Sequence, residues 1–352
     1  MEVNVEKEIK SSSVDFSFGE ILNLHKVNEI AIQPEYQRLF RWSNEQRSRL
    51  IESIIIGLPI PPIFLIETEH GILELIDGLQ RTSSVLQFMD ETSLGLDKLT
   101  LVGCDLVEEL NGKAFEDLDT FIRMKIKRTP IRAVIISKSN DDFIKYEMFK
   151  RLNTGGSNLS PQEIRNCSAR MLTGGREFYE FIQNLCAFPE FKTATLRLPD
   201  TTKERRGDEE LVLRFFAVKY FVNMFRDNVE EWLNEAMEAI LFKKINFDMQ
   251  VEGDEFKRVI TTIVEKLGDG AFTRLNKDDN PTGRLAPAYF EAVTMGVLRN
   301  LDAVRLMPED EVRRRHMELL RDPNFLSNTG PGASSVGKLQ GRIEAAVQAF
   351  SV

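Results

Sequence analysis

The sequence predicts an α+β protein, and three observations lead to that prediction. About the first 160 residues alternate short β-rich runs with amphipathic segments. The remainder has almost only the periodicity of helices. Hydrophobic residues make up 42% of the chain and charged residues 29%, which are the proportions of an ordinary globular protein. We therefore expect two domains, a mixed one at residues 14–160 and an all-helical one at 161–352.

Local signals predict the elements of the first domain. Residues before 14 have no periodic pattern and are expected to form a loose arm. A helix is expected to follow Ser43, because Ser43 and Gln46 have the spacing of a capping box. Gly57 ends that helix. This helix is expected at 43–56. The later patterns predict a β-hairpin from the runs 61–67 and 71–76, a helix at 81–91, a strand within 126–137 and a helix at 141–153.

The second domain begins with a strong helix start. Ser160 is a suitable N-cap, Pro161 fits the first helical position and Glu163 completes the capping pattern. Phe and Met residues in the helices that follow are expected to fill the core. The sequence GPGASSVGK lacks the P-loop spacing, so we expect a loop before the terminal helix. The intervening helices are expected at 210–225, 229–243, 255–267, 286–301 and 308–320.

Composition excludes several classes of protein. No apolar run reaches the roughly 20 residues of a membrane span, and the charged start MEVNVEKEIK is no secretory signal. Cys104, Cys167 and Cys186 are scattered, which predicts free thiols in a cytoplasmic protein. The net charge of −9 argues against nucleic-acid binding over the whole surface. A local basic stretch, 121–132, has five basic residues and no acidic one, but such clusters are usually solvated faces.

The stretch ILELIDGLQRTSS combines features of an anion site. An apolar run ends at Asp77, Gly78 allows a tight turn, and a helix is expected to start just after it. The first N–H groups of a helix have no acceptor within it and attract anions. Gln80 and Arg81 would bind phosphate oxygens there. Asp77 would hold a divalent metal or orient a water.

A simpler interpretation is also open at this stretch. Asp-Gly is a common turn, and Thr82 or Ser83 could merely cap the helix. A second Gln-Arg pair, Gln37 and Arg38, occurs in IQPEYQRLFRW. The two pairs could converge on one polyanion, or Arg38 could pair with a carboxylate. The aromatic residues of this segment could stack a base or pack under the following helix.

The stretch FKRLNTGGSNLSPQEIR, residues 149–165, is the third candidate. Its two glycines fit the end of a helix. Asn153 could instead ligate a metal or a phosphate, with Lys150 and Arg165 adding positive charge. Both interpretations stay open from these residues alone.

These three stretches together resemble a known family. QRLFRW, GLPIPP, DGLQR and RLNTGGSNLSPQEIR, in this order and spacing, are similar to the motifs of domain of unknown function 262. This is the ParB/sulfiredoxin-like N-terminal domain of GmrSD-type modification-dependent restriction enzymes and related phage-defence proteins. The resemblance covers about residues 15–170, and the helical remainder matches only in general style. It implies a ParB/sulfiredoxin-like fold for the first domain.

The resemblance also implies nucleotide binding, with NTP hydrolysis in several members, at the Asp-Gly-Gln-Gln-Arg turn. Leu79 departs from the pattern, because the family has the first of these glutamines at this position. The departure affects the expected hydrolysis more than the expected binding, since Arg81 and the helix end remain. Carried over by position, the catalytic residues are Asp77, Gln80 and Arg81, the nucleotide-binding residues are Gln37, Arg38, Gly78, Thr82 and Asn153, and Asp77 with Asn153 would hold Mg²⁺.

Many full-length relatives carry a C-terminal His-Asn-His nuclease domain. This chain has only His25, His70 and His316, which lie far apart in the sequence, so we expect no such nuclease in it. The leading hypothesis is an NTP-hydrolysing sensor or regulatory component of a bacterial anti-phage or restriction system, with a separately encoded nuclease or effector as partner. The alternatives are a non-catalytic DNA-binding or antitoxin-like module and a scaffold with a decayed site. A homo-oligomer through the apolar helices stays open.

Overall fold

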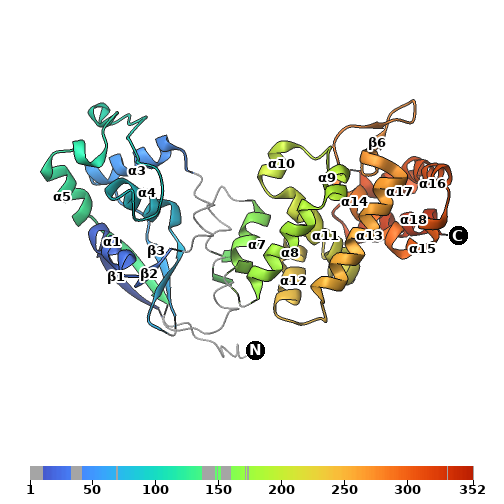
Figure 1. Ribbon diagram of the computed structural model, residues 1–352, viewed down its shortest axis with the longest axis horizontal. Coiled ribbons are helices and arrows are strands. Elements are labelled where there is room, and N and C mark those ends of the chain that lie inside the picture. The colour runs from blue at the N-terminus through green and yellow to red at the C-terminus, as the bar shows by residue number, and fades with distance from the viewer. Residues whose placement is uncertain are drawn as a thin grey trace. The chain divides into compact units, whose positions relative to one another are not determined.

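The structure is a computed structural model, and it describes residues 11–32, 42–68, 70–136, 147–148, 150–151, 160–170, 172, 174–330 and 332–351. The chain divides into two compact units, Met1–Gly156 and Ser157–Val352. The first unit combines a sheet with helices and the second is mostly helical, which confirms the predicted α+β class (Figure 1). Among the described residues, no helix is long and apolar enough to cross a membrane.

A five-stranded sheet forms the framework of the first unit. The predicted hairpin is present, because β3 and β4 pair antiparallel. β5 pairs parallel to β3 and antiparallel to β1, and β2 pairs parallel to β4. The order is β1-β5-β3-β4-β2. The strands are β1 (Ser11–Ser17), β2 (Ile30–Ala31), β3 (Ile63–Glu67), β4 (Leu73–Asp77) and β5 (Pro130–Ile136).

The expectation of a loose arm through residue 13 was wrong from Ser11 onward. Ser11 pairs with Ile136, and the strand continues antiparallel along β5. Five of its seven residues are exposed, so β1 has no buried face that would give an alternating pattern. Its partner lies more than 100 residues away in the sequence, so no local pattern predicts the pairing.

The sheet of the first unit is accompanied by α-helices, of which α1, α3, α4 and α5 are described over their full length. The capping box at Ser43 and Gln46 is confirmed, and Gly57 ends that helix in the left-handed conformation. The helix expected at 81–91 begins earlier, at Leu79. The helix expected at 141–153 lies largely outside the described residues. The helices are α1 (Phe18–Lys26), α3 (Asn44–Ile56), α4 (Leu79–Met89) and α5 (Thr120–Arg128), and neither α1 nor α5 was predicted.

The second unit is a helical bundle with one small β-ribbon. The ribbon pairs β6 (Arg274–Leu275) with β7 (Pro281–Thr282), so this unit is not wholly helical as expected. Asn276 organises its turn, because its side chain accepts from the N–H groups of Asp278 and Asn280. The helices are α7 (Pro161–Arg170), α8 (Gly175–Ala187), α9 (Pro189–Ala194), α10 (Asp200–Glu204), α11 (Gly207–Phe221), α12 (Val229–Leu241), α13 (Met249–Leu267), α14 (Pro287–Arg299), α15 (Leu301–Leu306), α16 (Glu309–Arg321), α17 (Pro323–Thr329) and α18 (Val336–Phe350).

Phenylalanine rings fill the core of this bundle, as the helical patterns predict. Phe215 and Phe256 meet edge to face with their centroids 5.0 Å apart. Phe191 packs on both Phe256 and Phe290, so α9, α13 and α14 share one aromatic cluster. Edge-to-face contacts are the arrangement that ring quadrupoles favour. These side chains are structural, and none is available to a cofactor.

A buried histidine makes the second unit sensitive to acid. His316 on α16 is buried, and its Nε2 bonds to the carbonyl oxygen of Ala271 at 2.9 Å. Burial lowers the pKa of His316 to about 4, although the bond to Ala271 opposes the shift. The unfolded chain takes up this proton near pH 6.5 and the folded chain only near pH 4. The contribution of His316 to the unfolding free energy is therefore fully present above pH 6.5 and is lost as the pH falls toward 4.

We expect the second unit to lose about 2 kcal/mol of unfolding free energy through His316 between pH 7.5 and 5. Urea unfolding at both pH values would measure this. Trp42 and Trp232 are the two tryptophans of the chain, so in a Trp42→Phe background the buried Trp232 reports on the second unit alone. His316→Gln keeps a donor but cannot titrate and should remove that part of the pH dependence. Equal pH dependence in both proteins would contradict the assignment.

Candidate functional site

The junction between β4 and α4 has the backbone geometry of an anion site. β4 ends at Asp77, and Gly78 follows with φ +96° and without a side-chain cap. The first bond inside the helix runs from the N–H of Thr82 to the carbonyl oxygen of Gly78 at 2.8 Å. The N–H groups of residues 79–81 therefore have no acceptor within the helix. Thr82 and Ser83 lie inside α4, so the interpretation that either one caps it is wrong.

Gly78 is required at this junction for two reasons. Its positive φ is a conformation that other residues rarely adopt. A Cβ at this position would also lie 2.4 Å from Cγ2 of Ile63 and 3.2 Å from Nη2 of Arg81. Glycine thus lets the start of α4 lie directly against β3.

Arg81 connects the start of α4 to the hairpin. Its Nη2 donates to Oδ2 of Asp77 and to the carbonyl oxygen of Pro62, both at 3.0 Å. Both side chains of the ion pair are partly buried. In this arrangement Asp77 already neutralises Arg81, so a metal or a phosphate would have to compete with that pair.

Gln80 connects the same turn to the segment that precedes α3. Its Oε1 accepts from the backbone N–H of Trp42 at 3.3 Å. Trp42 is the first described residue after the segment that holds Gln37 and Arg38. The chain therefore leaves that segment beside the Asp-Gly-Leu-Gln-Arg turn. A role for Gln80 in positioning water stays a prediction.

Three buried polar atoms in the first part of α4 have no hydrogen-bond partner among the described residues. They are Nε of Arg81, Oγ1 of Thr82 and Oγ of Ser83. Ser84, the next residue, is satisfied, because its hydroxyl donates to the carbonyl oxygen of Gln80 at 2.6 Å. An unsatisfied buried polar group costs about 1–3 kcal/mol, and each one calls for a partner such as a water, an ion or a ligand. The sequence had marked Arg81 and Thr82, but only burial reveals these atoms and adds Ser83.

Leu79 departs from the family motif for a visible reason. Its side chain is partly buried and packs against the hydrophobic core of the first unit. A glutamine amide there would meet apolar neighbours, and burying an amide without a partner is unfavourable. The leucine therefore contributes to packing at the position where the family has a polar side chain.

The remaining predicted site residues are not placed. Gln37, Arg38 and Asn153 lie outside the described residues, so their convergence on Arg81 stays a prediction. Within the described part of the chain, no three His, Cys, Asp or Glu side chains form a group that could hold a metal. Asp77 is the described member of the proposed Mg²⁺ pair, and its carboxylate binds Arg81. Coordination of Mg²⁺ by Asp77 and Asn153 likewise stays a prediction.

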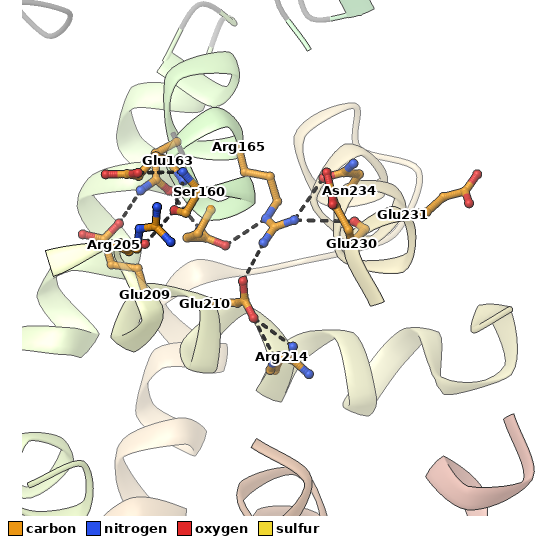
Figure 2. A network of polar contacts seen from close by, with 12 residues as sticks. Ser160, Glu163, Arg165, Arg205, Glu209, Glu210, Arg214, Glu230, Glu231 and Asn234 are labelled. Carbon is orange, nitrogen blue, oxygen red and sulfur yellow. Dashed lines mark hydrogen bonds and ion pairs between the residues drawn. The ribbon is translucent and has the colours of Figure 1, made fainter. Parts of the chain in front are cut away.

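Arg165 and Lys150 are engaged elsewhere, which corrects their proposed role as extra positive charge for a phosphate. Lys150 pairs with Oε1 of Glu147 at 2.8 Å. Arg165 on α7 is only 2% exposed and points between α11 and α12 in Figure 2. It donates to Oε2 of Glu210 at 3.0 Å and to Oδ1 of Asn234 at 3.1 Å. Burial raises the pKa of Glu210, but Arg214 and Arg165 outweigh this and keep it below its ordinary value.

The β4–α4 junction lies within a range that matches a known family. Residues 18–169 match the model of the GmrSD restriction endonuclease N-terminal domain. The matched range contains the junction and all three candidate stretches, and it ends within α7. It links this chain to restriction systems. No curated protein and no solved structure matches the chain.

Proposed function

We propose that this chain is a nucleotide-binding and NTP-hydrolysing component of a bacterial restriction or anti-phage system. The phosphates would bind at the first turn of α4. The observation that carries the proposal is the group of unsatisfied atoms there, Nε of Arg81 with the hydroxyls of Thr82 and Ser83. They lie beside backbone N–H groups that have no acceptor in the helix. The partial positive charge of a helix N-terminus also attracts an anion. The family match supports the restriction context.

The motif residues would divide the work between binding and chemistry. Arg81, joined by Arg38 and Gln37, would bind phosphate oxygens, and Gln80 would orient the attacking water. Asp77 and Asn153 would hold Mg²⁺, which supplies charge neutralisation on the phosphates when bound. Arginine is suited to this role, because its planar fork matches the geometry of a phosphate. Such charge stabilisation is the main source of rate in phosphoryl transfer.

Nucleotide binding also implies a local rearrangement of the Arg81 side chain. Its Nη2 now holds Asp77 and Pro62. A triphosphate beside Arg81 would draw the guanidinium toward itself and release the Asp77 carboxylate for the metal. In the site without nucleotide, the charges of Arg81 and Asp77 would therefore balance each other. Nucleotide binding would separate this pair.

A second candidate is a non-catalytic DNA-binding or antitoxin-like module. The position of Leu79 favours it, since an apolar side chain in the core replaces a residue that could act on water or phosphate. Phosphate release with each NTP, with and without DNA, would separate the two candidates. Asp77→Ala and Arg81→Ala should abolish release if the site hydrolyses nucleotide. Native release no faster than that of both variants, with DNA binding that depends on Arg81, would support the second candidate.

Thr82→Val tests the binding site without disturbing charge. The hydroxyl of Thr82 has no described partner, so removing it should leave the unliganded protein as stable or up to about 1 kcal/mol more stable. If the hydroxyl binds phosphate, nucleotide affinity should fall by about 10-fold, the worth of one such hydrogen bond. Isothermal titration calorimetry with ATP and GTP would measure the affinity, and thermal unfolding would measure the stability.

Ser84→Ala is the matched control for Thr82→Val. It also removes a buried hydroxyl from α4, but this hydroxyl bonds to the carbonyl oxygen of Gln80. We expect it to lower stability by about 1 kcal/mol and to leave nucleotide affinity unchanged. If Thr82→Val and Ser84→Ala affected nucleotide affinity equally, the hydroxyl of Thr82 would have no specific role.

A further inference from the structure

Helix α5 presents unpaired positive charge on the surface of an acidic protein. Its cations are Arg123, Lys125, Lys127 and Arg128, and none of them forms a salt bridge within the described residues. Arg123 bonds to the neutral hydroxyl of Thr120 instead. The chain as a whole has a net charge of −9, so this concentration of one sign is unusual for it. Figure 1 shows α5 at the margin of the first unit.

The basic helix α16 shows what an ordinary solvated helix looks like in this chain. Arg313, Arg314 and Arg315 follow one another there, as basic residues do in α5. Each of them is paired within its own helix, to Glu309 or to Glu311. The sequence alone treats both clusters as charged faces. The salt bridges of the described residues distinguish them, because the arginines of α16 are paired with glutamates and the cations of α5 are not.

Among the described residues, the acidic side chains near the start of α5 form no ion pair with its cations. Asp119 caps the helix by accepting from the N–H of Ile122. Asp117 accepts from the N–H of Ala114, and Glu116 pairs with Lys98. Among the described residues, the four cations of α5 therefore have no salt-bridge partner. Lys127 lies over the ring of Phe115 with its Nζ 5.7 Å from the ring centroid, and Lys125 and Arg128 are exposed.

Two large apolar side chains lie on the same outer face as two of these cations. Phe121 is 71% exposed and Met124 is 40% exposed. Residues 121, 124, 125 and 128 follow the spacing i, i+3, i+4 and i+7, which places them along one stripe of a helix. Ile126 lies on the opposite side and is buried. The stripe thus combines an exposed ring with Lys125 and Arg128.

We propose that α5 binds single-stranded nucleic acid, with Phe121 stacking on an unpaired base and Lys125 and Arg128 contacting phosphates. Proteins that bind single strands combine these two features, an aromatic platform and positive charge along the backbone path. A lipid surface fits less well, because an interfacial helix needs a broad apolar face and α5 exposes two apolar side chains among four cations. This inference goes beyond the proposed nucleotide site and does not depend on it.

The salt dependence of binding tests the electrostatic part. The probe is a fluorescein-labelled oligothymidylate of 20 nucleotides, titrated with the full chain in EDTA and followed by anisotropy. Two phosphate contacts predict a slope of log affinity against log salt of about −1.4, or about a 7-fold loss between 50 and 200 mM salt. Lys125→Ser/Arg128→Ser should remove this salt dependence.

Two further variants complete the test. Phe121→Ala should weaken binding by about 5- to 150-fold without changing the slope, since stacking releases no counterions. Arg313→Ser/Arg314→Ser removes the same charge from the paired helix α16 and should leave binding unchanged. Thr82→Val should bind the oligonucleotide normally, so a failed nucleotide site can be distinguished from a failed α5 surface.

Several outcomes would overturn the proposal. Absence of salt-dependent binding by the native chain would do so, as would equal weakening by the α5 and α16 double variants. If a blunt-ended duplex bound as tightly as the single strand and Phe121→Ala did not weaken binding, the stacking of Phe121 on an unpaired base would be contradicted. Binding to phosphatidylserine vesicles without binding to the oligonucleotide would assign α5 to a lipid surface instead.

Discussion

Replacing Glu291 with glutamine is expected to lower the unfolding free energy of the second unit by about 3–5 kcal/mol. Glu291 on α14 is 1% exposed and holds two buried arginines. Its Oε1 accepts from Arg214 on α11, and its Oε2 accepts from Nε of Arg342 on α18 at 3.1 Å. Removing one partner from a buried ion pair leaves the other charge without compensation in a poorly solvating environment, which is the source of the large cost.

The effect should be large because Glu291 belongs to a longer chain of alternating charges. Arg214 also bonds to Oε1 of Glu210, whose other oxygen accepts from Arg165 (Figure 2). Five side chains therefore connect α7, α11, α14 and α18. Burial alone would lower the pKa of Arg214, but Glu291 and Glu210 raise it above its ordinary value. Both glutamates thus favour the charged form of Arg214.

The measurement is urea unfolding followed by the fluorescence of Trp232 in a Trp42→Phe background. Glu318→Gln is the matched control, because Glu318 pairs with Arg314 on the surface of α16 and is 63% exposed. Exposed pairs contribute about 0–1 kcal/mol, so this variant should unfold almost as the parent does. Similar losses in both variants would show that burial does not set the strength of these pairs.

Replacing Gly78 with alanine is expected to destabilise the first unit by about 2–5 kcal/mol. The left-handed conformation costs a residue with a Cβ about 1–2 kcal/mol. The new methyl group would also approach Ile63 within 2.4 Å, and overpacking of this kind costs about 1–3 kcal/mol. Relief would require α4 to move away from β3, which would displace the proposed phosphate site as well.

Gly57→Ala separates the two contributions to this loss. Gly57 has a similar φ of +87°, but nothing lies within 4 Å of the position that its Cβ would occupy. It should therefore lose only the conformational part, about 1–2 kcal/mol. Hydrogen exchange of residues 63–89, read by mass spectrometry, would report the opening free energy of β3, β4 and α4. If Gly57→Ala cost as much as Gly78→Ala, the contact with Ile63 would be unimportant.

Local signals in the sequence predicted those elements that depend on neighbouring residues. The capping box at Ser43 and Gln46 places the start of α3, and the hairpin of β3 and β4 follows from two apolar runs with a turn between them. Strand β1 was missed, because its exposed residues carry no pattern and its partner β5 is distant in the chain. Thr82 was marked in the motif, whereas the unsatisfied hydroxyl of Ser83 depends on packing that no local rule contains.

By itself, the sequence determined the α+β class, the main helices and the Asp-Gly-Leu-Gln-Arg turn, because caps, periodicity and motif spacing act over a few residues. Tertiary structure alone decided which charges are free. Arg165 is buried against Glu210, Arg81 is held by Asp77, and the cations of α5 form no salt bridge with the described residues. The physical reason is that an ion pair depends on distance and burial, and both arise only when segments far apart in the chain pack together.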